Sequence, residues 1–289
     1  MADTALHHRW LLTVPFEQED GLSDWLAAHG ASASYRDADP PHTFFAYFPP
    51  GTALPDPAGL AAFPGCALQA EEAFADEDWL AKSREGFGSF EVGRGFYVKP
   101  LWEKASGPEG RRCVVVNPGL AFGTGGHETT RLCMATLEEL AAEGRLSGPV
   151  LDIGAGTGIL ALCAHVLGAK DIQAFDIDPD CGPAMEELVE LNAHLLGGRK
   201  PFRAFVGTLE DPAVQGPYRL LLANILLETI QELLPRMASL SAPGTLLVAS
   251  GILAERQDEA LLSLALAGFT PRKVSCEGAW IAILAEFGG

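Results

Sequence analysis

Apolar and polar residues alternate differently in the two parts of this chain. Near its start, Trp10, Leu12 and Val14 stand at every second position, as in a strand with one buried face. The stretch "GLSDWLAAHGA" then has an apolar helical face, and "HTFFAYFPP" resumes as a strand before a segment broken by Pro and Gly. The order strand, helix, strand over residues 10–48 predicts a small α+β domain at residues 1–68.

The pattern changes after a short connecting segment. Residues 69–89 have a helical pattern up to Gly86 and Gly88, which predicts a linker helix. Beyond it, apolar runs such as "CVVV", "VLDI", "LLLANI" and "TLLVAS" alternate with helical stretches. Strands with little internal alternation, separated by helices, are typical of a parallel sheet covered on both faces. Residues 90–289 are therefore predicted to form an α/β domain with a doubly wound sheet.

Composition narrows the class of protein. The net charge of −18, from 38 acidic and 20 basic residues, opposes contact with a phosphate backbone, so we expect no direct nucleic-acid partner. No apolar stretch reaches the roughly 18 residues that cross a bilayer, and no secretory signal pattern begins the chain, so we expect a cytoplasmic protein without membrane contact. We also expect a monomer. The scattered cysteines predict reduced thiols and no bound metal: Cys66, Cys113, Cys133, Cys163, Cys181 and Cys276.

A glycine-rich loop carries the clearest chemical signal. In "VLDIGAGTGIL" an acid, Asp152, precedes Gly154, Gly156 and Gly158, whose missing side chains let a ligand approach the backbone. Dinucleotide enzymes use the spacing G-x-G-x-x-G, and an acid here would repel their pyrophosphate. The acid suits a cationic aminoacyl group, such as the methionine end of S-adenosyl-L-methionine. Asp176, at the end of the next strand, offers a carboxylate to ribose hydroxyls.

This combination of acid, glycine loop, helix, strand and second acid resembles the class I S-adenosylmethionine-dependent methyltransferases, whose domain is a Rossmann-like doubly wound sheet. The resemblance implies S-adenosyl-L-methionine as cofactor. Two further positions have alternative interpretations. Asp178, before Pro179, is either a helix cap or a cofactor contact. Thr208 follows the third strand, where this fold commonly meets the adenine, and is predicted to bind the cofactor.

Further motifs narrow the resemblance to one family. The stretches "NPGLAFGTGGHETTRL", "VLDIGAGTGILAL", "DIDP", "LLANIL", "SGIL" and "EGAWIAIL" occur in the order and spacing of the PrmA family, over residues 110–289. Its members methylate lysine side chains and the N-terminal amine of bacterial large-subunit ribosomal protein eleven. The resemblance implies a small ferredoxin-like domain that recognises the substrate, a linker and a methyltransferase domain. A related branch modifies an electron-transfer flavoprotein subunit, and the linker sequence leaves the protein target open between the two.

The resemblance also implies roles for residues of the predicted site. Asn224 ends the fourth strand, beside the transferable methyl in such enzymes, and either positions the incoming amine or only closes the strand. The loop "GTGGHETT" is implied to shape the substrate entrance, with Thr124 and His127 as catalytic candidates and Thr130 as a cofactor contact. His127 is either a base or a loop organiser, and the threonines, Thr129 included, are predicted to cap the helix that follows.

Three functions are compatible with these observations. The first is a methyltransferase that acts on lysines of a ribosomal protein, the second is a methyltransferase for RNA or a small molecule, and the third is a non-catalytic cofactor-binding protein. The acidic charge and the sequence "ANIL", which lacks the N/D-P-P-Y pattern of base methylation, argue against nucleic acid. Asp152, the three glycines, Asp176 and Asn224 are all present, which argues against lost activity. The sequence therefore predicts a protein-lysine methyltransferase.

Overall fold

The computed structural model describes residues 6–15, 18–36, 43–75, 88–104, 106–118 and 126–288. The chain divides into two compact units, Met1–Gly86 and Phe87–Gly289. Each unit has a hydrophobic core of its own. The division falls near the end of the segment for which the sequence predicts a linker.

The first unit is an antiparallel sheet with a helix packed on one face. Its strands lie in the order β2-β3-β1-β4, which is the ferredoxin-like arrangement expected from the resemblance. Trp10 and Leu12 alternate along β1 and share one buried core with Leu22 and Leu26 of α1, as the sequence pattern predicts. A 3-10 helix, η2, stands between β3 and β4. The elements are β1 (Leu6–Thr13), α1 (Glu19–Ala28), β2 (Ala33–Arg36), β3 (Phe44–Phe48), η2 (Pro57–Ala62) and β4 (Ala67–Ala75).

The predicted linker helix is wrong where the structure describes it. Residues 67–75 form β4, which pairs with β1 from Leu6↔Ala75 to Thr13↔Ala67. The sequence "ALQAEEAFA" has a high helix propensity, but propensity is a weak prior that tertiary strand pairing overrides. The remainder of the predicted helix, up to residue 87, lies outside the described residues.

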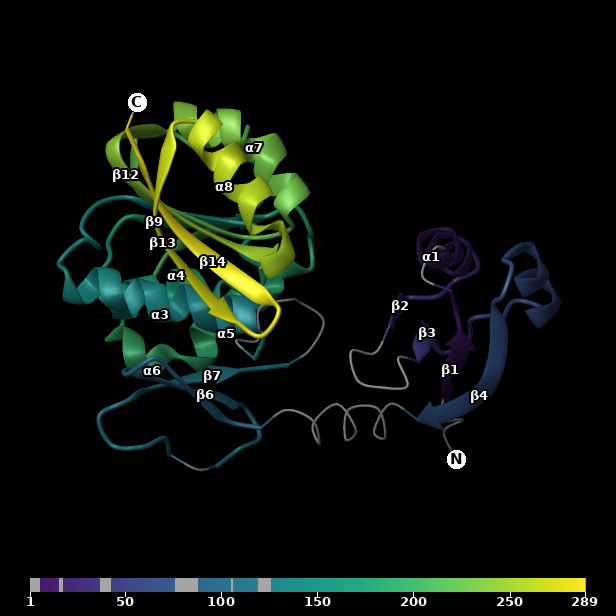
Figure 1. The fold of residues 1–289 in the computed structure, drawn as a ribbon. Helices are drawn as coiled ribbons and strands as arrows, with labels where there is room; N and C mark the ends of the chain where they lie inside the picture. The colour runs from purple at the N-terminus through teal and green to yellow at the C-terminus, as the bar shows by residue number, and fades with distance from the viewer. Residues whose placement is uncertain are drawn as a thin grey trace. The chain divides into compact units, whose positions relative to one another are not determined.

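The second unit contains a seven-stranded, mostly parallel sheet in the order β10-β9-β8-β11-β12-β14-β13 (Figure 1). Five neighbouring strands, from β10 to β12, run parallel, whereas β14 is antiparallel to both β12 and β13. The predicted doubly wound sheet is confirmed, with an antiparallel strand that the apolar runs did not indicate. The strands are β8 (Val150–Ile153), β9 (Ile172–Asp176), β10 (Arg203–Val206), β11 (Tyr218–Asn224), β12 (Ser241–Leu253), β13 (Phe269–Glu277) and β14 (Trp280–Phe287).

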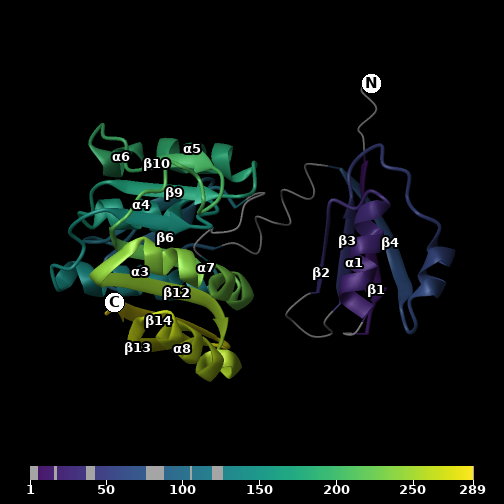
Figure 2. The ribbon, with the colours of Figure 1, turned by 90° about the horizontal axis from the view of Figure 1, so that it is seen from above.

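Helices cover both faces of this sheet (Figure 2). Along β11, Leu220 and Leu222 join a core with α3, α4 and α5, whereas Leu221 and Ala223 join a second core with α7 and α8. Burial on both faces explains why these strands are continuous apolar runs rather than alternating ones. The helices are α3 (Glu128–Ala142), α4 (Ile159–Val166), α5 (Cys181–Leu191), α6 (Ala193–Leu196), α7 (Leu227–Ser239), η3 (Ala254–Arg256) and α8 (Gln257–Leu266).

A separate three-stranded sheet precedes the main one, formed by β5 (Phe90–Val92), β6 (Phe96–Pro100) and β7 (Arg112–Val116). The run "CVVV" therefore belongs to β7 of this small sheet and not to the predicted parallel sheet. Asn192, fully buried after α5, accepts a hydrogen bond from the Val115 N–H at 2.8 Å and donates one to the Val115 carbonyl at 2.7 Å. An apolar run indicates a buried strand but cannot say which sheet it joins.

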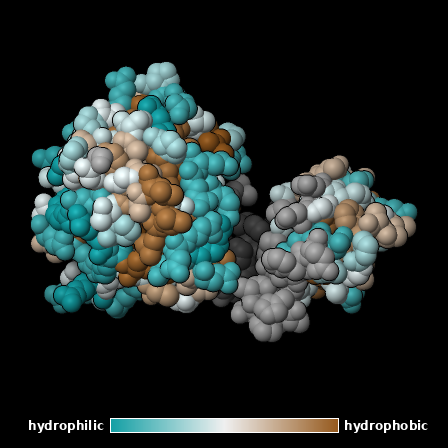
Figure 3. Space-filling model, turned by 45° about the horizontal axis from the view of Figure 1, so that its top comes forward, coloured by the Kyte–Doolittle hydropathy of each residue, from teal (hydrophilic) through white to brown (hydrophobic). Residues whose placement is uncertain are grey.

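The visible surface of the second unit is mostly polar, with an apolar band across it (Figure 3). A polar surface agrees with the excess of acidic residues in the sequence. In the described part of the chain, every helix is too short or too polar to cross a membrane.

Candidate functional site

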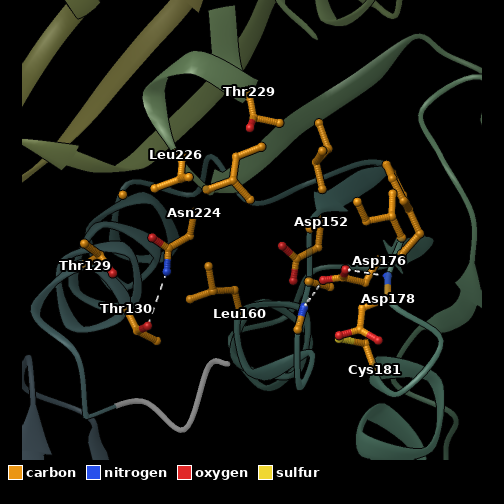
Figure 4. Close-up of a pocket in the computed structure, with 18 of the residues that line it drawn as sticks. Thr129, Thr130, Asp152, Leu160, Asp176, Asp178, Cys181, Asn224, Leu226 and Thr229 are labelled. Carbon is orange, nitrogen blue, oxygen red and sulfur yellow. Dashed lines mark hydrogen bonds between the residues drawn. The ribbon is translucent and has the colours of Figure 1, made fainter. Parts of the chain in front are cut away.

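A cavity of about 640 Å³ lies at the carboxyl ends of β8, β9 and β11 (Figure 4). The chain moves from β8 outward to β9 and β10 and then returns to place β11 on the other side of β8. Ligands of doubly wound sheets bind at such a switch point. Most of the predicted site residues line this cavity: His127, Thr130, Asp152, Gly154, Gly156, Asp176, Asp178, Thr208 and Asn224.

Asp152 is a buried acid in the cavity wall, with 1% of its surface exposed. Its Oδ2 accepts a hydrogen bond of 3.0 Å from the backbone N–H of Ala161, in the first turn of α4. Burial raises the pKa of Asp152 to about 7; the Ala161 hydrogen bond opposes this shift, and the nearby Asp176 adds to it. A positive charge in the cavity would favour the ionised form, so the residue is suited to bind a cationic group.

The glycine loop brings backbone close to the cavity. Gly154 has φ of +66°, and a Cβ at this position would overlap the side chain of Ile225. The Gly156 N–H donates a hydrogen bond of 2.8 Å to Oδ2 of Asp176. Gly158, the N-cap of α4, is not among the residues that line the cavity, and a Cβ there would press on core side chains. Gly154 and Gly156 therefore face the cavity, whereas Gly158 permits close packing behind it.

The second acidic position, Asp176, braces the loop. Its Oδ1 accepts the N–H of Asp178 at 3.1 Å, while its Oδ2 holds the glycine loop as described. Asp178 is exposed, and its Oδ1 accepts the N–H of Asp180 at 2.9 Å in the turn before α5. Thr208, also exposed, accepts the N–H two residues further on. Asp178 and Thr208 thus stabilise turns at the cavity edge while their side chains remain accessible to a ligand.

Asn224 ends β11 and presents an unpaired acceptor. Its Nδ2 donates to Oγ1 of Thr130, a buried residue of α3, at 3.3 Å. Its Oδ1 is buried and has no hydrogen-bond partner among the described residues. Figure 4 shows the amide nitrogen toward Thr130 and the oxygen turned away from it. An unpaired buried acceptor costs about 1–3 kcal/mol, and such a group calls for a donor from a ligand or water.

His127 organises the start of α3. It is the N-cap residue, and its Nδ1 accepts a hydrogen bond from the N–H of Thr129 at 3.3 Å. The prediction that threonines cap this helix is wrong for Thr129 and Thr130, which lie buried inside its first turn. The His127 ring meets Trp280 edge-on, with 5.0 Å between ring centroids. Thr124, the third catalytic candidate, lies outside the described residues.

Several residues that line the cavity received no role from the sequence, among them Trp280, Ile177 and Leu226. Trp280 comes from β14, and Ile177 and Leu226 line the cavity while remaining 74% and 65% exposed. Trp280 stands inside the quoted motif "EGAWIAIL", but nothing in the motif says that an antiparallel strand returns to the site. Ile177 comes directly after the end of β9 and Leu226 two residues after the end of β11, positions that could have indicated them.

The electrostatic character of the cavity is anionic. Three carboxyl groups line it, from Asp152, Asp176 and Asp178, and no described lining residue is Lys or Arg. Such a wall attracts cations and repels phosphate. Among the described residues there is no cluster of three or more His, Cys, Asp or Glu side chains that could hold a metal ion.

The strand order, the acid-flanked glycine loop and the cavity at the switch point together define a class I methyltransferase. The chain belongs to the ribosomal protein L11 methyltransferase (PrmA) family, whose pattern matches residues 63–287. It is 34% identical to the "Ribosomal protein L11 methyltransferase" of Geobacter metallireducens, over 95% of this chain and 96% of the relative. It is 39% identical to the protein of that name from Trichlorobacter lovleyi, over 75% and 70% of the two chains.

A solved structure supports the same assignment. The crystal structure of a "ribosomal protein L11 methylase" from Lactobacillus delbrueckii subsp. bulgaricus is 29% identical in sequence. It superposes with a TM-score of 0.62 and covers 70% of this chain and 100% of its own. The family expected from the sequence motifs is therefore confirmed.

Proposed function

We propose that this chain transfers methyl groups from S-adenosyl-L-methionine to lysine side-chain amines of a large-subunit ribosomal protein, with the N-terminal amine as a further acceptor. Family membership and the names of its relatives support the substrate. The observation that carries the proposal is the buried, unpaired Oδ1 of Asn224 in the wall of an acidic cavity. We further propose that the protein acts in the cytoplasm as a monomer and does not bind nucleic acid directly.

The cavity suits this cofactor in charge and in hydrogen bonding. S-adenosyl-L-methionine carries a positive sulfonium and ammonium group and supplies an already activated methyl. Asp152 offers a buried carboxyl group to the cationic end, and Asp176 offers a carboxylate to ribose hydroxyls. Gly154 and Gly156 leave room for the ligand against the backbone. We assign Thr208 and Asp178 to the adenosine end at the cavity edge.

The difficult step is to present a lysine as a neutral nucleophile. Its ordinary pKa of about 10.4 leaves roughly one molecule in a few thousand neutral at pH 7. Burial among apolar walls, beside a cationic cofactor, lowers that pKa by desolvation and by repulsion between like charges. Asn224 Oδ1 then accepts an N–H of the amine and directs the nitrogen lone pair toward the methyl.

The residues around Asn224 have supporting roles in this proposal. Thr130 orients the amide, since its Oγ1 accepts the Nδ2 hydrogen bond and so leaves Oδ1 for the substrate. His127 acts as an organiser of the entrance and not as a base, because its Nδ1 accepts the Thr129 N–H at the N-terminus of α3, which places the proton of the neutral ring on Nε2. Methyl transfer to a desolvated amine requires no strong base.

The test is methyl transfer with defined acceptors. Purified protein is incubated with methyl-labelled cofactor and, separately, with ribosomal protein L11, an electron-transfer flavoprotein subunit and RNA, and mass spectrometry locates the label. We expect labelled lysines in the ribosomal protein. Label in the flavoprotein subunit alone would move the chain to the related branch, and label in RNA alone would refute protein methylation.

Asn224 is tested in the same assay. Asn224→Ala is expected to lower turnover by about 10- to 100-fold, because the acceptor that aligns the amine is gone. Its affinity for S-adenosyl-L-homocysteine, measured by calorimetric titration, should stay within about threefold. Thr229→Ala, which removes another polar residue of the cavity wall, is the matched control and should keep its turnover. Unchanged turnover in Asn224→Ala would remove Asn224 from the reaction.

A further inference from the structure

Two motifs that the sequence shows far apart are tied together by one arginine. Arg131, in the first turn of α3, belongs to "GTGGHETTRL", and Glu277, at the end of β13, belongs to "EGAWIAIL". The Arg131 Nε donates to Oε1 of Glu277 at 2.8 Å, across 146 positions of sequence. Its Nη2 lies 2.6 Å from the same oxygen. The contact therefore links the start of α3 to the β13–β14 hairpin.

The same guanidinium also binds Gly126, the residue that directly precedes His127. The Arg131 Nη1 donates to the carbonyl oxygen of Gly126 at 2.5 Å. Its Cζ lies 6.0 Å from the ring centroid of Phe90, and its Nη2 lies 4.0 Å from Oε1 of Glu128. A planar guanidinium group with several N–H donors can make all these contacts at once, whereas the single ammonium group of Lys cannot.

Both partners of Arg131 are adjacent to cavity residues. Gly126 directly precedes His127, and Glu277 is paired in register with Trp280 across the hairpin turn. His127 and Trp280 line the cavity and touch each other edge-on. Arg131 is not among the described residues that line the cavity, so its action on a ligand is indirect.

Helix stability does not explain this arginine. A cation in the first turn of a helix opposes the helix dipole and is unfavourable by about 0.3–1 kcal/mol. Two other ion pairs, Arg145 with Glu286 and Lys273 with Glu139, already join the α3 segment to the same hairpin. Residues that are unfavourable for their local secondary structure are expected at functional sites. Arg131 is such a residue, and it lies at the end of α3 that borders the cavity.

We propose that Arg131 is a positioning residue, which sets the geometry of the His127–Trp280 pair by holding Gly126 and Glu277 together. Its effect on the reaction rests on the proposed methyl transfer, whereas its effect on Trp280 does not. The chain has five tryptophans, and incorporation of 5-fluorotryptophan gives each a ¹⁹F resonance. Trp280→Phe identifies the resonance of Trp280.

The first measurement is made without substrate. Arg131→Ala and Glu277→Gln are expected to shift or broaden the Trp280 resonance, and Arg131→Lys to shift it less than Arg131→Ala. Arg145→Ala removes an ion pair between the same segment and hairpin and is expected to leave the resonance in place. If Arg131→Ala does not fold, Arg131→Lys and Glu277→Gln carry the test. A Trp280 resonance unmoved by the Arg131 and Glu277 variants, or moved equally by Arg145→Ala, would overturn the proposal.

The second measurement is methyl transfer to the protein acceptor. Arg131→Ala is expected to lower kcat by about 10- to 100-fold, as misplacement of a site by about 1 Å does, with partial rescue in Arg131→Lys. The dissociation constant of S-adenosyl-L-homocysteine should change by less than about threefold. Equal loss of kcat in Arg145→Ala would show a merely structural role and count against the proposal. A wild-type protein without transferase activity would count against the proposed function. The ¹⁹F spectra would still test whether Arg131 positions Trp280.

Discussion

Replacement of Asp152 by Asn should separate what this residue contributes to stability from what it contributes to binding. The ordinary pKa of its carboxyl group is 3.8, and burial raises it to about 7. Between these values the folded protein keeps a proton that the unfolded chain has lost, so the free energy of unfolding falls as pH rises. Below pH 3.8 both states are protonated, and above about pH 7 both are ionised, so the fall is confined to this window.

The size of the effect follows from the width of the window. Each pH unit in it corresponds to about 1.4 kcal/mol, and the slope flattens near pH 7 as the folded-state group ionises, so wild-type protein loses about 2 kcal/mol between pH 5 and pH 7 and about 3 kcal/mol by pH 8 through this one group. Asp152→Asn is neutral at every pH, and its amide oxygen retains an acceptor for the Ala161 N–H. The stability of the variant relative to wild type should therefore rise by about 3 kcal/mol from pH 5 to pH 8.

Urea unfolding of the ligand-free proteins, followed by circular dichroism at pH 5, 6, 7 and 8, measures this difference. Thr229→Ala, which changes the same cavity wall without changing a titratable group, is the control and should show no such trend. Calorimetry at pH 8 should show that Asp152→Asn has lost affinity for S-adenosyl-L-methionine despite its gain in stability. A stability difference that stays flat from pH 5 to pH 8 would refute the reasoning.

Two further predictions concern the walls of the cavity. Asp176→Ala should weaken the binding of S-adenosyl-L-homocysteine by about 10-fold or more, because it removes both the proposed ribose acceptor and the brace of the glycine loop. Asp180→Ala removes an exposed carboxylate that is not among the described residues lining the cavity, and it should stay within about threefold in the same calorimetric titration. Gly154→Ala combines a positive φ with overlap on Ile225 and should lower stability by about 1–3 kcal/mol more than Gly197→Ala, which has a similar φ of +55° and open space around it. Equal melting temperatures for the two alanine variants would contradict that assignment of strain.

Much of the site could be predicted because parallel strands share one carboxyl edge. Asp152, Asp176 and Asn224 stand in or at the ends of three apolar runs, and the structure brings all three to one cavity. Trp280 could not be placed, since it arrives on an antiparallel strand whose neighbours are decided by tertiary pairing. The role of His127 as the N-cap was missed for a different reason: the sequence predicted threonines as the caps of this helix, whereas the His127 side chain accepts the N–H of Thr129.

The fold, too, could be predicted only as far as local sequence pattern determines it. The two periodicities were visible in the sequence, and so were the small α+β unit and the doubly wound sheet. The strand at residues 67–75 has helix-forming composition and becomes β4 only through its pairing with β1. The "CVVV" run joins a separate sheet through contacts such as that of Asn192 with Val115, which lie 77 positions apart. Local pattern carries no information on partners at that distance.

The anionic lining of the cavity also bears on how the enzyme completes a cycle. In the proposed reaction the cofactor enters with a positively charged sulfur and leaves as a neutral thioether, because the charge departs with the methylated amine. The attraction of Asp152, Asp176 and Asp178 for the sulfur is therefore lost in the same event that forms the product. In the proposed reaction the acidic wall therefore contributes less to holding spent cofactor than to holding fresh cofactor, and this difference in charge favours exchange before the next round of methylation.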